Sequence, residues 1–402
     1  MKKTAAGLIS VLGLALSASL STPATAADDT VVIGVMNDQN GIYSEASGRG
    51  SVVAAKMAIE DLGGTILGKP VEVLVANHQN KPDIGLSVAR EWYDSKGVDA
   101  IFEVANSTIA LGVQDLARNR RKIVIHSTST SSDLTGKACS PYGLMWTADS
   151  WSNSGPLIQQ LLKEGNTSYF FITADYAFGH SLESVASAAI TSGGGKVVGS
   201  VRVPLATADY SSFLITAQSS KAQVIVLALA GSDLTNAIKQ SGEFGITQKQ
   251  KLATPTAYIN DIHALGLPAT QGLFFTQSWY WDQSDETRRW SQRFADVMKR
   301  MPSDSHAGVY SSVTHYLKAV RKVGSKDPDA VLKAMRETPV SDIYTRDGHV
   351  REDGRVVYDR YLVRVKGAAE SKKPWDYLDL VAKIPAANAF QSMKTGGCPL
   401  TQ

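Results

Sequence analysis

Apolar residues recur along this 402-residue chain in two patterns that alternate with each other. Short continuous apolar runs, such as residues 31–36, predict buried strands, whereas an apolar residue at every third or fourth position, as in residues 52–62, predicts a helix with one buried face. The predicted strands are 31–36, 71–76, 100–104, 123–125, 169–173, 196–201, 224–228, 252–254, 273–276, 356–365 and 377–383. The predicted helices are 52–62, 83–95, 109–118, 156–164, 179–191, 210–219, 234–244, 286–299, 308–323 and 328–338.

The same alternation of strands and helices occurs twice, first up to residue 125 and again from residue 156 to residue 254. Strands that alternate with helices pair in parallel, with helices on both faces of the sheet. The sequence therefore predicts an α/β protein with two similar lobes. Two long helices, 286–299 and 308–323, follow the second series and indicate that the chain crosses back to the first lobe.

The N-terminus has the pattern of a secretory signal peptide. Lys2 and Lys3 precede an apolar stretch over residues 4–20, and Ala24-Thr25-Ala26 fits a cleavage site after Ala26. We therefore expect residues 1–26 to be removed and the mature protein to be periplasmic. The chain holds two cysteines, Cys139 and Cys398, and in an exported protein such a pair predicts one disulfide; two free thiols are the alternative.

Charge and motifs exclude several classes of function. The net charge is only +3 and the charged residues are evenly spread, so no nucleic-acid partner is expected. Residues 63–70 imitate a phosphate-binding loop, but Pro70 stands where a magnesium-binding hydroxyl belongs. The seven histidines form no metal-ligand pair, and His126 beside Ser127 lacks the remaining groups of a hydrolase. We expect no metal, no cofactor and no enzymatic activity.

Two hydroxyl-rich clusters are the strongest candidates for a binding site. Asn106 and Ser107 follow one predicted strand and open a helix, and residues 127–132, which include Thr128, Ser129 and Thr130, follow the next strand. Such residues either cap the helix or bind an anion at its positive end. Because both clusters lie at the carboxyl ends of neighbouring strands, where open α/β sheets bind ligands, we predict an anion site there.

Aromatic residues follow other predicted strands at the same edge. Tyr43 lies after the first strand, Tyr176 and Phe178 lie after strand 169–173, and Tyr258 lies after strand 252–254. Such rings can enclose an apolar ligand, or they can simply pack beneath a helix. A further aromatic group consists of Trp151, Trp279, Tyr280 and Trp281, and these residues either contact the ligand or support a hinge.

The ordered set of features resembles a known family. The signal peptide, the strand 31–36, Ser107 at a helix start, the run Thr128-Ser129-Thr130 and the motif at 175–179 together resemble the periplasmic substrate-binding proteins of ABC importers, in particular the branched-chain amino-acid-binding branch. The resemblance implies the type I fold, in which two Rossmann-like lobes with parallel central sheets are joined by a three-crossover hinge. The expected boundaries are 27–147 with 278–357 for the N-terminal lobe, 148–277 with 358–384 for the C-terminal lobe, and 385–402 for a tail tied back to the N-terminal lobe.

The resemblance also implies roles for individual residues. Ser107 and Thr130 would hold a ligand carboxylate together with backbone groups of Thr128 and Ser129, and Phe178 would approach from the other lobe. It implies a monomer that traps a small molecule by hinge closure and delivers it to the permease of an ABC importer.

One departure from the family pattern bears on the ligand. Amino-acid binders of this family pair the ligand ammonium with an acid after the strand that corresponds to 252–254, and here Tyr258 stands at about that place. An unpaired buried ammonium is costly, so the sequence favours an aromatic or other apolar acid without an amine. If Asp261 replaces the missing acid, the ligand is a branched-chain amino acid; an amide or urea ligand and a role as the sensor for a membrane receptor are further alternatives.

Overall fold

The computed structural model describes residues 1–2 and 30–401. Its first sheet has five parallel strands in the order β4-β1-β5-β6-β7, and we call the part of the molecule built on it the N-lobe. The strands are β1 (Val32–Asn37), β4 (Glu72–Asn77), β5 (Ala100–Glu103), β6 (Ile123–His126) and β7 (Gly143–Met145). All residues of β1, β5, β6 and β7 are buried, which explains why these strands are continuous apolar runs in the sequence.

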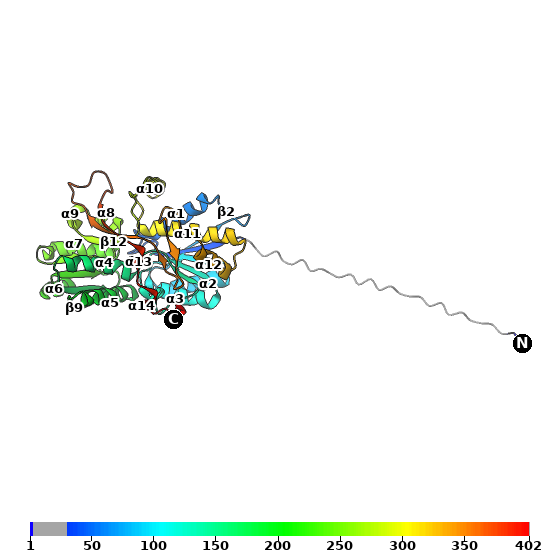
Figure 1. Ribbon diagram of the computed structural model, residues 1–402, viewed down its shortest axis with the longest axis horizontal. Coiled ribbons are helices and arrows are strands. Elements are labelled where there is room, and N and C mark those ends of the chain that lie inside the picture. Colours follow the sequence, from blue (N-terminus) through cyan, green and yellow to red (C-terminus); the bar gives the residue numbers. More distant parts are fainter. Residues whose placement is uncertain (3–29, 402) are drawn as a thin grey trace.

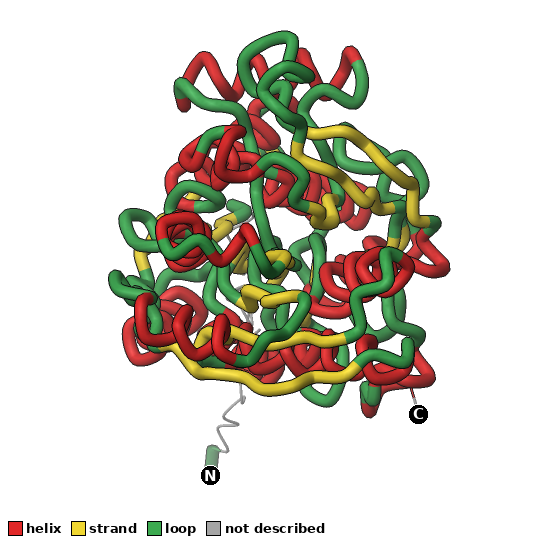
Figure 2. The backbone as a smooth tube through the Cα atoms, turned by 90° about the vertical axis from the view of Figure 1, so that its left-hand side faces the viewer, coloured by secondary structure: helices red, strands yellow, loops and turns green. Residues whose placement is uncertain are grey.

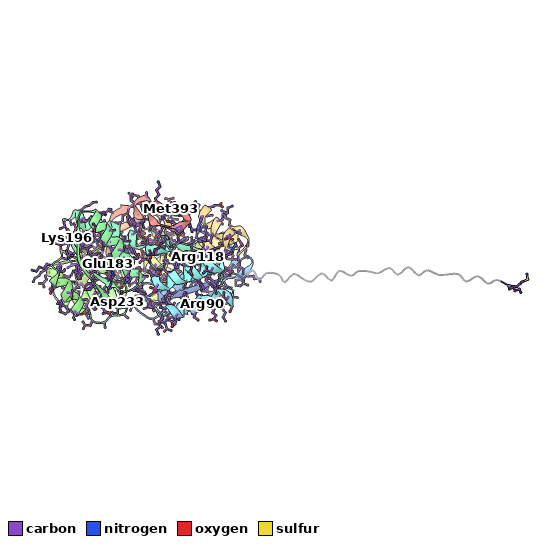
Figure 3. The ribbon with its side chains drawn as sticks, turned by 90° about the horizontal axis from the view of Figure 1, so that it is seen from below. Arg90, Arg118, Glu183, Lys196, Asp233 and Met393 are labelled. Carbon is purple, nitrogen blue, oxygen red and sulfur yellow. A yellow bond between two sulfur atoms is a disulfide. The ribbon has the colours of Figure 1, made fainter. Side chains whose placement is uncertain are left out.

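A second sheet of four parallel strands has the order β11-β10-β8-β9, and we call the part built on it the C-lobe. Its strands are β8 (Ser168–Ala174), β9 (Lys196–Val203), β10 (Val224–Ala228) and β11 (Lys251–Ala253). The two lobes lie side by side along the long axis of the molecule (Figure 1). Arg90 and Arg118 of the N-lobe accordingly lie in the opposite half of the molecule from Lys196 and Asp233 of the C-lobe (Figure 3).

Helices surround the strands, as the tube view shows (Figure 2). The N-lobe sheet is accompanied by α1 (Gly48–Asp61), α2 (Pro82–Asp94), α3 (Ser107–Arg120), α10 (Asp285–Met298), α11 (Asp304–Val323) and α12 (Pro328–Glu337). The C-lobe sheet is accompanied by α4 (Ser150–Lys163), α5 (Ala177–Ser192), α6 (Ser211–Ser219), α7 (Ser232–Glu243), α8 (Ile259–Leu265) and α9 (Leu267–Thr270). The packing of α11 against α1 shows that the chain returns to the N-lobe, as the two long helices of the sequence predict.

A third sheet joins segments that are far apart in the sequence. Strands β12 (Phe274–Gln277), β15 (Arg360–Val365) and β16 (Leu378–Ile384) are antiparallel in the order β12-β15-β16. The single strand expected at 356–365 is therefore two strands, because β14 (Val356–Val357) pairs with β13 (His349–Val350) before β15 joins the other sheet. The short pair β2 (Thr65–Ile66) and β3 (Lys69–Pro70) occupies the run that imitates a phosphate loop, which makes it a hairpin. The exact boundaries of the lobes stay a prediction.

Helix α4 begins six residues before the predicted start at Pro156, and the reason is local. The Asp149 carboxylate caps the helix by accepting from Ser152 N at 2.7 Å. In return, Ser152 Oγ accepts from Asp149 N at 3.0 Å. Pro156 then lies inside the helix and has no N–H to donate to the carbonyl of Ser152. The hydroxyl of Thr276 in β12 donates to that carbonyl instead, at 3.1 Å, so the side chain of another segment compensates for the proline.

The C-terminal tail lies against the N-lobe side of the molecule. Cys139 and Cys398, which are 259 residues apart, form the expected disulfide. Arg351 donates to the carbonyl of Gln391, and the guanidinium of Arg355 lies 4.5 Å from the ring centre of Phe390. The tail also contains α13 (Ala386–Ala389) and α14 (Met393–Gly396).

Two sequence predictions concern the ends of the chain and the membrane. The predicted signal peptide, apart from its first two residues, and the cleavage site after Ala26 lie outside the described residues. Within residues 30–401, none of the helices combines the length and the apolar character needed to cross a bilayer.

Candidate ligand-binding site

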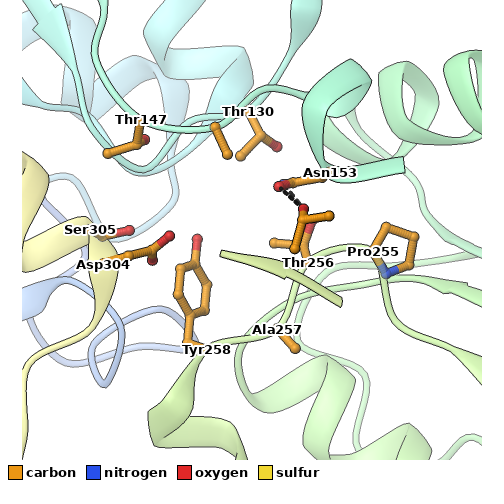
Figure 4. Close-up of a pocket in the computed structure, with 11 residues that line it drawn as sticks. Thr130, Thr147, Asn153, Pro255, Thr256, Ala257, Tyr258, Asp304 and Ser305 are labelled. Carbon is orange, nitrogen blue, oxygen red and sulfur yellow. Dashed lines mark hydrogen bonds between the residues drawn. The ribbon is translucent and has the colours of Figure 1, made fainter. Parts of the chain in front are cut away.

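Two adjoining cavities lie between the lobes. Both are small, since the space open to the centre of a water-sized sphere is about 10 Å³ in each. Thr130, Thr256 and Tyr258 line both, so the cavities form two compartments of one site, the second of which is drawn in Figure 4. The first compartment is also lined by Tyr43, Ala105, Ser107, Thr128, Tyr176, Phe178 and Ala230. The second is also lined by Thr147, Ala148, Asn153, Pro255, Ala257, Thr276, Asp304 and Ser305.

Two hydroxyl groups of the N-lobe wall have no partner within the described residues. Ser107 is the first residue of α3, and Thr130 follows β6 on the neighbouring strand of the sheet. Both side chains are buried, and neither Ser107 Oγ nor Thr130 Oγ1 is hydrogen-bonded. Since a buried hydroxyl without a partner is costly, these two groups can hold the oxygens of a ligand at the positive end of a helix.

Asn106, Thr128 and Ser129 of the two clusters are already engaged, whereas the hydroxyl groups of Ser127 and Ser131 are unpartnered in the described part of the chain but line neither compartment. The side-chain oxygen of Asn106 accepts from Thr108 N at 3.0 Å and from Ile109 N at 3.3 Å, which is a helix cap. Thr128 Oγ1 donates to Glu103 at 2.7 Å, and Ser129 Oγ donates to the carbonyl of Val104. Thr128 still lines the first compartment, whereas Asn106 and Ser129 line neither compartment. Each cluster therefore contains both a structural polar side chain and a free hydroxyl group.

These engaged hydroxyls hold an unusual turn at the end of β5. Glu103 and Val104 have φ angles of 85° and 49°, in the left-handed region that non-glycine residues rarely adopt. Glu103 is fully buried and accepts from Ser51 Oγ at 2.9 Å as well as from Thr128. Burial raises the pKa of Glu103 to about 7, although both hydrogen bonds act in the opposite direction. Through its hydrogen bond to Glu103, the turn holds the side chain of Thr128 at the first compartment.

The C-lobe wall is aromatic. Tyr176 is the N-cap of α5 and Phe178 is in its first turn, with ring centres 5.7 Å apart. Tyr258 is the N-cap of α8, and its phenol ring lies beside Asp304 and Ser305 (Figure 4). Burial raises the pKa of Tyr176 and of Tyr258, so the two phenols are neutral hydrogen-bonding groups. Of the residues predicted from sequence, the structure brings together Tyr43, Ser107, Thr128, Thr130, Tyr176, Phe178 and Tyr258.

Contacts across the cavity hold the lobes close together. The phenols of Tyr43 and Tyr176 are hydrogen-bonded to each other, and Ser232 N donates to the carbonyl of Ile42 at 3.1 Å. Gly231 precedes Ser232 with a φ of 60°, and a Cβ atom there would lie only 2.1 Å from the Ile42 carbonyl oxygen. Glycine is therefore required for this approach of the two lobes.

Asp261, which the sequence offers as a substitute acid, does not reach the site. Its carboxylate accepts from Tyr258 N at 2.8 Å and so completes the cap of α8, and burial raises its pKa to about 7. Asp261 lines neither compartment. The structure therefore places the carboxylate of Asp261 in a helix cap, outside both compartments.

Sequence analysis did not identify Asp304 and Ser305. The predicted helix begins at Gly308, whereas α11 begins at Asp304 with Ser303 as its cap. Ser303 followed by an acid in the first turn is a recognisable helix start, so the signal was present in the sequence. This earlier start brings Asp304 into the second compartment. Burial raises the pKa of Asp304 to about 6, against the lowering effect of Arg360 and nearby N–H groups.

The predicted aromatic residues near the crossovers lie elsewhere. Trp151 lines a separate groove between α4 and the segment 382–392, so we leave it out of the ligand set. The indole of Trp279 donates to the carbonyl of Ile343, and Tyr280 and Trp281 both donate to the carbonyl of Trp375. These three residues support loops and line neither compartment.

The described residues hold no group of three side chains that could bind a metal ion. His126 is fully buried and bonded to Gln114 at 3.1 Å, and burial lowers its pKa to about 3. It lines neither compartment of the site, so it is not placed to act as a base there.

Comparison with known proteins agrees with this arrangement. Residues 30–372 match the sequence family described as "Periplasmic binding protein". This chain belongs to that family. The family and the fold are those of binding proteins rather than enzymes, and membership implies a periplasmic location.

Three relatives give the degree of similarity. A periplasmic binding protein from Burkholderia mallei is 45% identical, with a TM-score of 0.92 over 93% of this chain and 100% of that chain. A branched-chain amino acid ABC transporter periplasmic ligand-binding protein from Burkholderia xenovorans is 38% identical, with a TM-score of 0.81 over 93% of this chain and 100% of that chain. The Leu/Ile/Val-binding protein homolog 6 of Brucella abortus is 26% identical over 60% of this chain and 62% of its own length, which is less than two thirds of that relative. The structural similarity confirms the type I fold that the sequence predicts.

Proposed function

We propose that this protein is an extracytoplasmic receptor that captures a small carboxylate-bearing ligand between its lobes and delivers it to an ABC importer. The observation that carries the proposal is the pair of unpartnered, buried hydroxyl groups of Ser107 and Thr130 at the start of α3 and the end of β6. Hydroxyl donors beside a helix N-terminus suit a carboxylate without requiring a cationic side chain.

The opposite wall supports an apolar body for the ligand. Phe178 and Tyr176 cover the first compartment from the C-lobe, and Tyr43 completes the enclosure from the N-lobe. We therefore favour an aromatic or other apolar acid. The related protein from Burkholderia xenovorans is named for branched-chain amino acids, which makes such an amino acid the competing ligand class.

Ser107→Ala is the direct test of the carboxylate site. A hydrogen bond to a charged group contributes about 1.5–3 kcal/mol, so we expect the variant to bind an acid such as benzoate or 4-methylpentanoate roughly ten- to hundredfold more weakly. Thr108→Ala is the matched control, because Thr108 is the next residue of α3 and is exposed. Calorimetric titration of both variants and the wild type gives the affinities.

The outcomes separate the parts of the proposal. Unchanged affinity in Ser107→Ala, or failure of every acid to bind, would refute the carboxylate receptor. Binding of leucine but not of 4-methylpentanoate would replace the ligand class and leave the receptor intact. Loss of the gene should abolish cellular uptake of the ligand, whereas a sensor would leave uptake unchanged.

A further inference from the structure

The second compartment contains an acid with an unused acceptor atom. Asp304 is only 7% exposed, and its Oδ2 accepts a long hydrogen bond of 3.4 Å from Ser278 N. Its Oδ1 has no partner within the described residues. The carboxyl group points toward the cavity beside the Tyr258 phenol (Figure 4). Because buried polar atoms are nearly always hydrogen-bonded, this oxygen requires a partner that the chain itself does not provide.

The neighbouring polar groups are mostly engaged with one another. Asn153 Nδ2 donates to Thr256 Oγ1 at 3.3 Å, Thr147 Oγ1 donates to the carbonyl of Ser127 at 2.7 Å, and Thr276 Oγ1 donates to the carbonyl of Ser152. None of these three hydrogen bonds involves Asp304. Asp304 is the carboxylate among the residues that line this compartment, and together with the free hydroxyl group of Thr130 it can accept from a molecule in the cavity.

A buried cation offsets the charge of Asp304 without occupying its free oxygen. Arg360 is fully buried in β15 and donates to Ser152 Oγ and to Asn153 Oδ1, the latter at 3.0 Å. Its positive charge acts on Asp304 through space. The partner of Asp304 thus need not be a cation, and a neutral O–H or N–H donor is sufficient.

The position of Asp304 relative to Ser107 defines where this donor lies on the ligand. Ser107 lines only the first compartment and Asp304 only the second, with Thr130, Thr256 and Tyr258 shared between them. A ligand that fills both compartments, with its carboxylate at Ser107 in the first, therefore has its far end beside Asp304 in the second.

We propose that Asp304 is a second polar subsite that accepts a hydrogen bond from a hydroxyl or amino group at the end of the ligand remote from its carboxylate. This inference rests on the proposed function. It narrows the ligand class to apolar acids with a donor at the far end, such as ring-hydroxylated or ring-aminated aromatic acids.

Matched pairs of acids test the subsite in the wild-type protein. The pairs are benzoate with 3- and 4-hydroxybenzoate, benzoate with 4-aminobenzoate, and cinnamate with 4-hydroxycinnamate; 4-methoxybenzoate controls for size because it cannot donate. We expect the donor-bearing acid of at least one pair to bind at least tenfold more tightly than its parent, and the methoxy acid to gain nothing. Calorimetric titration measures each dissociation constant.

Asp304→Asn then tests whether the preference depends on this side chain. The variant should lose most of the tenfold preference while its affinity for the plain acid stays within about threefold of the wild type. Asp285→Asn is the matched control, because Asp285 is also in the first turn of a helix but is exposed. Circular dichroism establishes that both variants are folded, and the pairs on the wild type decide the question if Asp304→Asn does not fold.

Every result decides for or against the subsite. Equal affinities within all pairs, with binding that still depends on Ser107, would refute the subsite and leave the proposed function in place. An equal loss for both members of a pair in Asp304→Asn would show a structural role and would also refute it. Failure of all acids to bind the wild type would refute the proposed function and the subsite together.

Discussion

The wall of the site that comes from the N-lobe presents polar atoms without partners, whereas the wall from the C-lobe presents aromatic rings that belong to the core of that lobe. Ser107 Oγ, Thr130 Oγ1 and Asp304 Oδ1 are buried and unbonded on the first wall. On the second wall, Phe178 is only 4% exposed and is part of the main apolar cluster. The N-lobe wall therefore lowers the stability of the unliganded protein, and the C-lobe wall contributes to it.

This difference indicates that the two walls contribute to binding in different ways. Unpartnered polar atoms gain most from a ligand, because their hydrogen bonds exist only in the complex. The aromatic wall is formed before the ligand arrives and provides shape and apolar surface. We expect substitutions on the first wall to change mainly affinity, and substitutions on the second to change both affinity and folding.

Phe178→Ala should produce the largest change in stability. Removal of a buried phenylalanine ring typically costs about 3–5 kcal/mol, because apolar burial is lost and a cavity remains. We expect the free energy of unfolding of the unliganded protein to fall by about that amount in urea titrations. Ser107→Ala, on the opposite wall, should leave it unchanged or slightly higher.

Phe244→Ala is the matched control for this prediction. Phe244 is at the end of α7 in the same lobe but is 40% exposed, so its removal should cost much less. A loss below about 1 kcal/mol in Phe178→Ala, or an equally large loss in Ser107→Ala, would contradict the division between the two walls.

Glu103→Gln should remove a pH-dependent cost from the N-lobe wall. The pKa of Glu103 is raised from 4.5 to about 7 in the folded protein. Between these values the native state holds more protons than the unfolded state, so stability decreases as pH rises from about 4.5 to about 7. The ionisation of Glu103 lowers the free energy of unfolding by about 3 kcal/mol over this range. In Glu103→Gln, which keeps an acceptor for Ser51 and Thr128, we expect the free energy of unfolding to fall with pH by about that much less.

Urea unfolding at pH 4.5 and pH 7.5 measures this difference. Burial also raises the pKa values of Asp233, Asp261 and Asp304, so the wild type is compared with the variant rather than interpreted alone. Glu60→Gln, an exposed acid on α1, should keep the wild-type dependence on pH. An identical pH dependence in Glu103→Gln and the wild type would show that Glu103 is not the buried acid responsible.

The fold could be read from the sequence because buried parallel strands leave continuous apolar runs and helices leave a regular spacing. Both hydroxyl clusters could be found for the same reason, since they follow two such strands. Which hydroxyl groups of the second cluster are engaged could not be predicted, because the hydrogen bonds of Thr128 and Ser129 depend on the turn at Glu103 and Val104. Local sequence does not encode that turn.

Asp304 and Trp151 show how long-range packing changes which residues face the site. Asp304 lines the site although it was not predicted, and Trp151 lies elsewhere although it was predicted as a ligand contact. Asp304 reaches the cavity because α11 starts early and packs on α1, a contact between segments about 250 residues apart. Trp151 was expected near the ligand, yet α4 begins at Ser150 and directs its first turn toward the groove beside the C-terminal tail. In both cases the exact helix start decided which residues face the site.

Asn106→Ala should give the smallest of these effects and tests whether the N-lobe wall is correctly divided into structural and binding groups. The Asn106 side chain caps α3 through Thr108 N and Ile109 N, and loss of such a cap costs about 1 kcal/mol. Asn106→Ser should retain most of the cap and most of the stability. Affinity for an acid ligand should change by less than about threefold in both variants, because the ligand is held by Ser107 and Thr130. If Asn106→Ala instead weakens binding more than tenfold while the free energy of unfolding stays constant, Asn106 belongs to the binding groups, as the sequence predicts, and the cap leaves its amide free to contact the ligand.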